Sequence, residues 1–272
     1  MKTLFVVSDV HSFYDEMIKS LTDKGFDIDN KDHIFVSCGD LLDRGPNAVK
    51  CLRFVNNLPD NRKILIRGNH EDLLQDAIYK GFFQAHDYHN RTNDTVYQLT
   101  GIRPGNDKSI MDAHSAAILS MKFNKDWNNY IDSCINYYET KDYIFVHGWI
   151  PSLNKLVDSE SNITGIPVVK NLPIYDEYWR DDFSDWKEAR WSNGMYMWSE
   201  GVREPNKTIV CGHFHSSWGH CNLHNNGVEF SETTSGVQSI HTPFYDDGII
   251  ALDSCVVYSG FVNCLKLEVE DE

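Results

Sequence analysis

The chain has 272 residues, and 41% of them are hydrophobic, which is enough for the core of one large α/β domain. Its 25 basic and 40 acidic residues give a net charge of -15, which argues against bulk nucleic-acid binding because that role needs a cationic surface. No stretch approaches the ~20 apolar residues of a membrane span, and the short N-terminal apolar run does not suit a signal peptide.

The first half of the chain alternates short apolar runs with segments of helical spacing. Strands are predicted over residues 4–7, 33–37 and 63–66, and helices over 12–24, from Pro46 onward and over 71–79. This alternation is typical of βαβ units and predicts an α/β fold with a parallel sheet.

The second half adds two stretches of different character. Residues 81–105 lose periodicity and predict an inserted loop or cap, while 109–140 return to helical spacing. Further strands are predicted over 143–146, 208–211, 249–252 and 262–267, and residues 151–205 read as irregular. We therefore expect one domain over residues 1–272, with cap or insert segments at 81–125 and 150–205.

Seven widely spaced cysteines contain no CxxC pair. They indicate neither a disulfide framework nor a zinc knuckle. Reduced thiols in a cytoplasmic protein are the simplest interpretation.

Five short polar strings each follow a predicted strand: Ser8-Asp9-Val10-His11, Gly39-Asp40-Leu41-Leu42-Asp43-Arg44-Gly45, Gly68-Asn69-His70-Glu71, His147-Gly148 and Gly212-His213-Phe214-His215. They supply carboxylate, amide and imidazole groups, which bind divalent metals. Because ligand sites form at the carboxyl ends of strands in open α/β sheets, these strings can converge on one rim. The sequence predicts a site for two metal ions.

The ligands divide between the two ions. Asp40 is the best candidate for a shared, bridging carboxylate, with Asp9 and His11 turned towards the first metal. The second metal would be completed by three further side chains, Asn69, His147 and His213. Such a pair would activate a bridging water for attack on a phosphate ester.

Three more residues supply what the metals do not. His70 can act as a general acid towards the leaving group, and Asp43 is placed to orient its ring and raise its pKa. Arg44 offers a planar fork that can bind two phosphate oxygens.

The strings GDLLDRG, RGNHE, HG and GH resemble the phosphoprotein phosphatase branch of the calcineurin-like metallophosphoesterases, over residues 4–267. The resemblance implies a two-sheet β-sandwich flanked by helices, with the dimetal site at the strand ends. It implies the same ligands and the His70–Asp43 acid dyad, and it favours manganese, with iron or zinc as alternatives. The small bacterial and phage members, which include protein phosphatases and dinucleoside polyphosphate hydrolases, are closest in length.

This chain departs from the family pattern at several positions. Ser8 and Ser12 replace glycines of the first motif, and Trp149 follows His147-Gly148. The GHxH form of the last motif makes His215 a further candidate ligand of the first metal. Arg203 is the candidate for a second phosphate-binding arginine, with Arg180 or Arg190 as alternatives.

The leading functional hypothesis is a serine/threonine protein phosphatase. The alternatives are a nucleotide phosphohydrolase, such as a diadenosine tetraphosphate hydrolase, and a phosphodiesterase that uses His215. The expected partner is a phosphorylated protein or a nucleotide.

Other chemistry-bearing residues have structural interpretations. Trp179, Trp186, Trp191 and Trp198 are expected to pack as hydrophobic anchors, with an aromatic wall for a base or peptide as the minority alternative. His86, His89 and His114 are expected on the polar surface of the cap.

Overall fold

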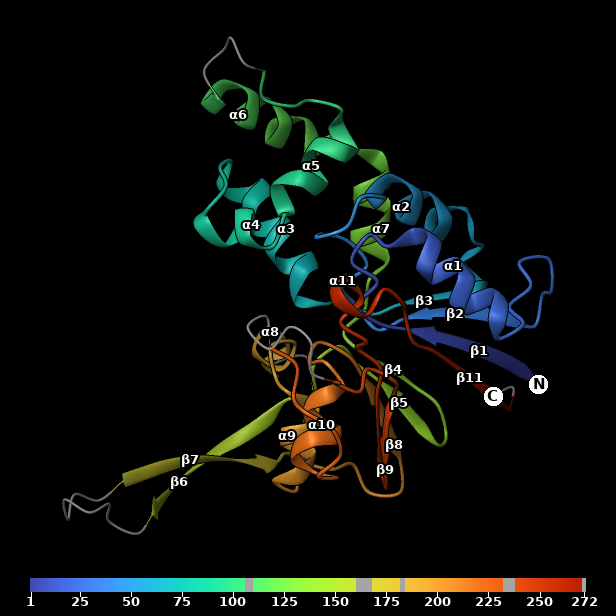
Figure 1. Ribbon diagram of the computed structural model, residues 1–272, viewed down its shortest axis with the longest axis vertical. Helices are drawn as coiled ribbons and strands as arrows, with labels where there is room; N and C mark the ends of the chain where they lie inside the picture. The colour runs from blue at the N-terminus through green and yellow to red at the C-terminus, as the bar shows by residue number, and fades with distance from the viewer. Residues whose placement is uncertain (106–109, 160–167, 182–183, 232–237, 271–272) are drawn as a thin grey trace.

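The computed structural model describes residues 1–105, 110–159, 168–181, 184–231 and 238–270. Two β-sheets pack against each other and helices cover their outer faces, as Figure 1 shows. The predicted α/β fold, a two-sheet sandwich flanked by helices, is confirmed.

The first sheet contains the parallel strands that the first half of the sequence predicts. Its order is β11-β1-β2-β3, with β1, β2 and β3 parallel and β11 antiparallel to β1. The strands are β1 (Lys2–Val7), β2 (His33–Ser37), β3 (Lys63–Leu65) and β11 (Cys264–Val269). Helices α1 (Tyr14–Asp23), α2 (Ala48–Asn57) and α7 (Lys125–Ser133) pack on its outer face.

The second sheet is built from the second half of the chain. Its order is β4-β5-β8-β10-β9, and β5, β8 and β10 run parallel. The strands are β4 (Tyr138–Glu139), β5 (Tyr143–Phe145), β8 (Thr208–Cys211), β9 (Phe244–Asp246) and β10 (Ile249–Ala251). Helices α8 (Trp186–Ala189), α9 (Gly194–Ser199) and α10 (Ser217–Asn222) lie on its outer face.

The central strands of the two sheets bury both faces, which explains their continuous apolar runs; they are β1, β2, β5, β8 and β10. In β1, Leu4 and Val6 face the core between the two sheets, whereas Phe5 and Val7 face the helices. Phe145 of β5 joins the same inter-sheet core from the opposite side. Alternate side chains therefore bind each sheet to two layers, and the strand ends are held on one rigid frame.

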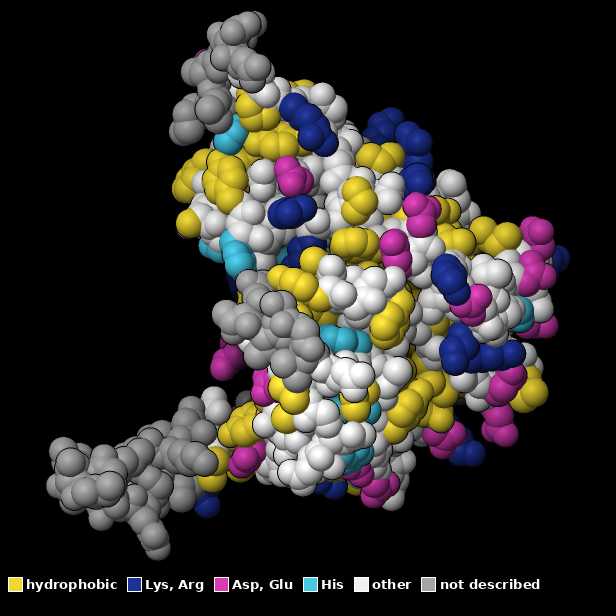
Figure 2. Space-filling model, in the orientation of Figure 1, with side chains coloured by type: hydrophobic (Ala, Val, Ile, Leu, Met, Phe, Trp, Pro, Cys, Tyr) yellow, Lys and Arg dark blue, Asp and Glu magenta, His cyan; other side chains and the backbone are white. Residues whose placement is uncertain are grey.

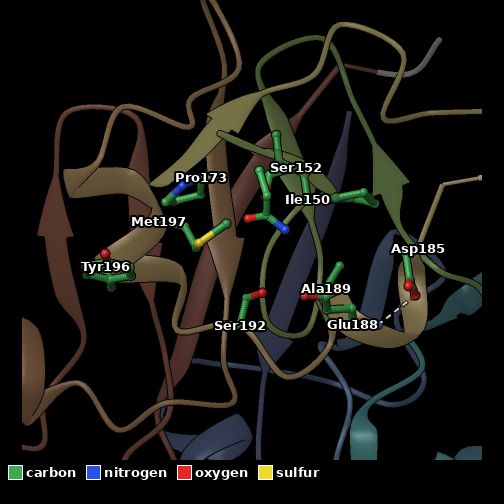
Figure 3. A pocket seen from close by; sticks show the side chains of 11 residues that line it. Ile150, Ser152, Pro173, Asp185, Glu188, Ala189, Ser192, Tyr196 and Met197 are labelled. Carbon is green, nitrogen blue, oxygen red and sulfur yellow. Dashed lines mark hydrogen bonds between the residues drawn. The ribbon is translucent and has the colours of Figure 1, made fainter. Parts of the chain in front are cut away.

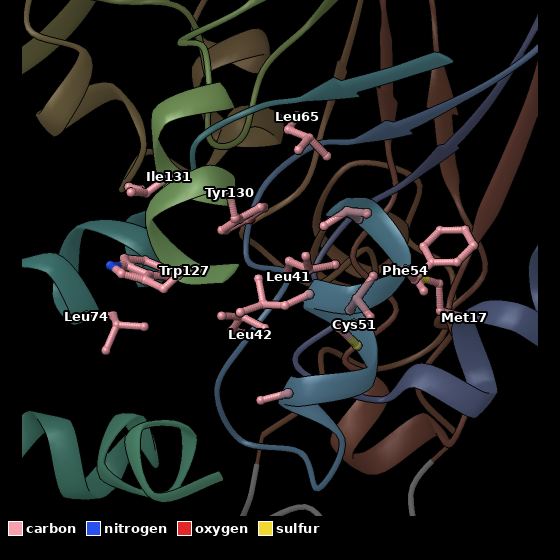
Figure 4. Packing of buried hydrophobic residues seen from close by; sticks show 14 of the residues in the cluster. Met17, Leu41, Leu42, Cys51, Phe54, Leu65, Leu74, Trp127, Tyr130 and Ile131 are labelled. Carbon is pink, nitrogen blue, oxygen red and sulfur yellow. The ribbon is translucent and has the colours of Figure 1, made fainter. Parts of the chain in front are cut away.

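The loop after β2 is packed from outside by α7. Trp127 and Tyr130 of this helix lie in one buried cluster with Leu41, Leu42 and Leu74, as Figure 4 shows. Because Leu41 and Leu42 lie between Asp40 and Asp43, this packing fixes the loop that carries both carboxylates.

The segment 81–105 is more ordered than the sequence predicts. Beyond α3 (Asn69–Lys80) it contains α4 (Ala85–His89) and α5 (Thr92–Thr100), and α6 (Ile110–Met121) follows. Of the two predicted alternatives, a loop or a cap, the loop is wrong, because α4 and α5 are helices that are short and show little apolar periodicity, while the cap stays a prediction. Gly81 and Gly101, at φ of 79° and 71°, end α3 and α5 in the left-handed conformation that favours glycine.

Residues 151–205, which the sequence also predicts to be irregular, contain a β-hairpin. Strands β6 (Ser152–Ser159) and β7 (Val168–Tyr175) pair antiparallel from Ser152↔Tyr175 to Ser159↔Val168 and project from the body in Figure 1. The division of residues 1–272 into one domain with inserts at 81–125 and 150–205 stays a prediction.

The tryptophans of this segment divide into two kinds. Trp179, Trp186 and Trp198 are buried in the core outside the second sheet, as anchors should be. Trp191 is 49% exposed, so the anchor prediction is wrong for this residue.

Two short helical turns remain to be named: η1 (Asp60–Arg62) precedes β3, and α11 (Val256–Ser259) precedes β11. Within the described ranges, no helix has the length and apolar character needed to cross a bilayer.

The inter-sheet core gives a stability prediction. Replacing the fully buried Phe145 with Ala should destabilise the protein by about 3–5 kcal/mol, because it removes a ring between two sheets that cannot easily close together. Urea unfolding measures the change. Tyr79→Ala, at a position 86% exposed, is the control and should cost under about 0.5 kcal/mol; equal losses would contradict the assigned core.

Candidate metal centre

The residues that follow the strands adopt an uncommon backbone conformation. Asp9, His11, Asp40 and His213 have φ values of 52°, 48°, 52° and 65°, in the left-handed region that few non-glycine residues enter. Hydrogen bonds between the loops hold them there, from the Asp9 N–H to the Gly39 carbonyl (3.2 Å) and from the His11 N–H to the Asp40 carbonyl (3.0 Å). The polar strings therefore form tight turns over the sheet rim.

Asp40 belongs to two groups of side chains, which are buried except for the half-buried His213. One group contains His11, Asp40 and His70, and the other contains Asp40, His147 and His213; within each group the ligand atoms lie within 4.8 Å of one another. Asn69 joins the second group, because its Oδ1 lies 2.8 Å from both His147 Nε2 and His213 Nδ1. The structure thus brings together the four side chains predicted for the second metal.

The first group differs from its predicted membership. His70, predicted as the acid, belongs to it, while Asp9 belongs to neither group. Asp9 Oδ2 instead lies 2.9 Å from the His213 N–H and 2.5 Å from Ser8 Oγ.

The two departures at Ser8 and Trp149 have structural explanations. A Cβ at Gly212 would lie 1.8 Å from Ser8 Oγ, so the Ser8 hydroxyl occupies space that glycine leaves open in the last motif. Trp149 is buried in the core outside the second sheet, where its Nε1 donates to the Val202 carbonyl at 2.9 Å.

The hydrogen bonding of two histidines fits a bound cation. His147 Nδ1 lies 2.7 Å from the Cys38 carbonyl and His11 Nδ1 lies 3.0 Å from the Leu42 carbonyl, so in each neutral ring Nδ1 carries the proton. The Nε2 lone pair of His147 then faces only acceptors, Asn69 Oδ1 and, at 3.3 Å, Asp40 Oδ1. Acceptors that converge in this way need a proton or a metal ion between them.

The pKa shifts of the group that contains His147 and His213 also indicate a place for positive charge. Burial opposes protonation of His147, but the Asp40 and Asp9 carboxylates raise its pKa to about 10. Burial raises the pKa of Asp9 to about 6, and burial together with His147 lowers the pKa of His213 to about 3. The buried carboxylates therefore hold positive charge in this cluster, and a divalent cation would supply it in place of a proton.

Asp43 positions His70 as predicted, and Thr92, which sequence reasoning missed, in turn holds Asp43. His70 Nδ1 lies 2.8 Å from Asp43 Oδ2, which also accepts a 2.7 Å hydrogen bond from the Thr92 hydroxyl of the cap. Arg44 Nη2 lies 3.3 Å from His70 Nε2. Burial opposes protonation of His70, yet the Asp40 and Asp43 carboxylates raise its pKa above the ordinary value.

Glu71 is a second positioning residue without a predicted role. Its carboxylate accepts from the N–H groups of Asp40 (3.0 Å), Leu41 (3.1 Å) and Gly68 (2.7 Å), and from the Tyr130 hydroxyl (2.9 Å). The signal was available, because a Glu three residues after a candidate helix N-cap is a capping pattern. One side chain thus fixes two of the loops that carry candidate metal ligands.

Asp253 was also missed. It follows β10 and is buried, with Oδ1 accepting from the Cys255 N–H at 2.7 Å. Burial and the Asp9 carboxylate raise its pKa well above the ordinary value. Its position at the end of a predicted strand was the available signal.

The remaining candidates lie outside both groups. His215 Nδ1 lies 2.8 Å from Ser217 Oγ, and its ring contacts Phe214 and Phe230. The other three candidates are arginines, each engaged with neighbouring side chains or backbone: Arg203 stacks on Trp198 at 4.0 Å, Arg180 pairs with Glu139 and Glu204, and Arg190 donates to Asp72 at 2.8 Å. Their predicted binding roles stay predictions.

A separate cavity of about 200 Å³ lies at the base of the β6–β7 hairpin, as Figure 3 shows. Ile150, Ser152 and Met197 line it. Asp185, the N-cap of α8, also lines it and accepts a hydrogen bond from the Glu188 N–H. No member of the two histidine–aspartate groups lines this cavity.

The Glu71 contacts give a stability prediction. Glu71→Gln keeps one oxygen and turns an amide N–H₂ towards donors, so it should destabilise the fold by about 2–3 kcal/mol. Urea unfolding measures the loss, and calorimetry with Mn²⁺ should show weaker binding because the loops lose their anchor. Glu188→Gln, at an exposed position, is the control; an unchanged midpoint and Mn²⁺ affinity for Glu71→Gln would contradict the assigned role.

Comparison with known proteins agrees with this geometry. Residues 2–217 match the model of the calcineurin-like phosphoesterase family. A cold-active protein-tyrosine phosphatase of Shewanella sp. shares the fold, with a TM-score of 0.51 and 19% identity over 98% of this chain and 76% of that chain.

Curated relatives match shorter stretches. The symmetrical bis(5'-nucleosyl)-tetraphosphatase of Buchnera aphidicola subsp. Baizongia pistaciae is 24% identical over 170 residues, covering 53% of this chain and 60% of the relative. The serine/threonine-protein phosphatase 1 of Salmonella typhimurium is 36% identical over 74 residues, covering 27% of this chain and 32% of the relative. The match thus covers less than two thirds of either relative. The family match over residues 2–217 shows that the chain belongs to the calcineurin-like phosphoesterase family.

Proposed function

We propose that this chain is a phosphoric ester hydrolase that holds two divalent cations on either side of Asp40. The observation that carries the proposal is the shared Asp40 carboxylate between two buried histidine groups. Asp9 and His11 would complete one site, and Asn69, His147 and His213 the other. Bound cations would lower the pKa of a water and neutralise developing charge on the phosphate.

The mixed oxygen and nitrogen donors suit manganese, iron or zinc. The donors are hard or borderline, and imidazole nitrogens among them disfavour calcium. We propose manganese as the first metal to test.

The protein's own groups would act on the phosphate and the leaving group. The Arg44 guanidinium can donate to two phosphate oxygens and hold the ester in line. His70 would donate its proton to the departing oxygen, and the Asp40 and Asp43 carboxylates, which raise its pKa, favour the protonated form. Asp43 would hold the ring in place and stabilise the protonated form.

We propose a dinucleoside polyphosphate as the first substrate class. The Buchnera relative, named as a symmetrical bis(5'-nucleosyl)-tetraphosphatase, matches over the longer stretch. A polyphosphate also suits a site that continues past Arg44 into a basic pocket. From the sequence alone, phosphoproteins are the first substrate candidate. The pocket beside Arg44 leads us to place dinucleoside polyphosphates before them.

Phosphoserine and phosphothreonine proteins are the second candidate. The Salmonella relative named as a serine/threonine-protein phosphatase supports them. A phosphodiesterase role gains no support, because His215 lies outside both metal groups. A cytoplasmic location also stays a proposal.

The acid dyad gives a mechanistic prediction. His70→Asn should lower kcat by about 10²–10⁴ for alkyl phosphates, and by less for p-nitrophenyl phosphate, whose leaving group needs no proton. Asp43→Asn should shift the alkaline limb of the kcat profile to lower pH, because it removes a carboxylate that raises the His70 pKa.

Metal content decides between two roles for His70. His70→Asn should still bind two equivalents of manganese, measured by elemental analysis, with His86→Asn, at an exposed position, as the control. Loss of one equivalent together with equal losses on both substrates would make His70 a ligand and contradict the acid role.

A substrate panel tests the proposed function. Manganese-loaded protein should hydrolyse p-nitrophenyl phosphate and diadenosine tetraphosphate, with the higher kcat/KM for the dinucleotide, and a chelator should abolish both. Preference for a phosphothreonine peptide would move the substrate to proteins. Inactivity on every phosphate ester would contradict the hydrolase itself.

A further inference from the structure

A pocket of about 280 Å³ opens beside the catalytic groups. Arg44 lines it, and the same side chain lies 3.3 Å from His70. Phe13, His89, Arg91 and Tyr258 also line it. Because Arg44 belongs to both places, a substrate bound at Arg44 would have its next groups at this pocket, which we call the Arg91 pocket.

The Arg91 pocket is basic on a chain whose net charge is -15. Arg44, His89 and Arg91 line it, and no acidic side chain does so. Arg91 is exposed, and in the part of the chain that the structure describes its guanidinium has no carboxylate partner within ion-pair distance. Figure 2 shows dark blue and cyan side chains on the side of the helical lobe that faces the sandwich. An anionic ligand would meet the guanidinium groups of Arg44 and Arg91 here.

The two arginines are held in place by contacts between their loops. The Arg44 N–H donates to the Asn90 carbonyl at 3.2 Å, and the Thr92 hydroxyl donates to Asp43 at 2.7 Å. Arg44 and Arg91 both adopt left-handed backbone, with φ of 61° and 58°. Such conformations are costly for arginine and persist where the surroundings fix them, often at functional sites.

Aromatic rings also line the pocket. Tyr258 of α11 is 52% exposed and packs on Phe230 with ring centroids 4.6 Å apart. Phe13 is partly buried and packs against the hydrophobic core between the first sheet and its helices. A base can stack on such a ring without a particular sequence of hydrogen bonds.

We propose that the Arg91 pocket binds a second, non-reacting phosphate of a nucleoside polyphosphate, with Tyr258 placed to contact the base. This inference rests on the proposed function, because the first phosphate must lie at Arg44 and the metal groups. It assigns Arg91 and His89 to substrate specificity. The sequence predicts only a polar surface position for His89. A phosphate monoester would leave the pocket empty.

The test uses inhibitors that share the anion but differ in length. Inorganic tripolyphosphate and orthophosphate compete with p-nitrophenyl phosphate at fixed free Mn²⁺, in the wild type and in Arg91→Asn. Asparagine removes the charge but tolerates left-handed backbone, so the loop should fold. Arg91→Lys restores a charge, and Arg53→Asn changes an exposed arginine of α2 outside the pocket.

Arg91→Asn should weaken tripolyphosphate inhibition about tenfold, as loss of a charged hydrogen bond does, and Arg91→Lys should recover part of it. Orthophosphate inhibition and p-nitrophenyl phosphate turnover should change by less than about twofold, as for a surface substitution. The KM for diadenosine tetraphosphate should rise with the tripolyphosphate inhibition constant.

The inference is wrong if Arg91→Asn leaves tripolyphosphate inhibition unchanged, or if it weakens inhibition by tripolyphosphate and orthophosphate equally. It is also wrong if the substitution affects only acidic phosphopeptides, which would assign the pocket to protein substrates. If diadenosine tetraphosphate is not hydrolysed, the proposed substrate fails while tripolyphosphate inhibition still tests the pocket. If no ester is hydrolysed, calorimetric binding of tripolyphosphate against orthophosphate gives the same comparison.

Discussion

The Asp40 carboxylate is the group on which the rest of the site depends. Burial favours its neutral form, yet charged His147 and His70 hold its pKa well below the usual range. Its Oδ1 also accepts from the His70 N–H at 2.9 Å, and its own N–H donates to Glu71. A negative charge in a buried position is stable only when cations and donors surround it, so histidines from separate loops must converge on it.

Convergence on Asp40 explains why the loops are so strictly held. The two sheets bury both faces of their central strands and leave the strand ends little freedom. Glu71 then binds the loop after β2 to the loop after β3, and Tyr130 of α7 binds Glu71 from outside. The left-handed turns are stable because several such contacts fix them at once.

The segment that contains α4 and α5 also contributes contacts to the site. The Thr92 hydroxyl donates to Asp43, and the Asn90 carbonyl accepts from the Arg44 N–H, so this segment sets the position of Asp43 and Arg44, two residues proposed to act on the substrate. The same contacts place Arg91 beside Arg44 at a shared pocket.

The sequence by itself determined the fold class, the parallel strands and the side chains around Asp40, because short apolar strands and metal-binding residue types are local signals. His11, Asn69, His147 and His213 could be named in this way. Only the tertiary structure showed that His70 lies within a histidine–aspartate group, that Arg203 stacks on Trp198, and that Thr92 and Arg91 adjoin the site. Those positions depend on how the cap and inserts pack on the sandwich, and contacts between distant segments leave no periodic trace in the sequence.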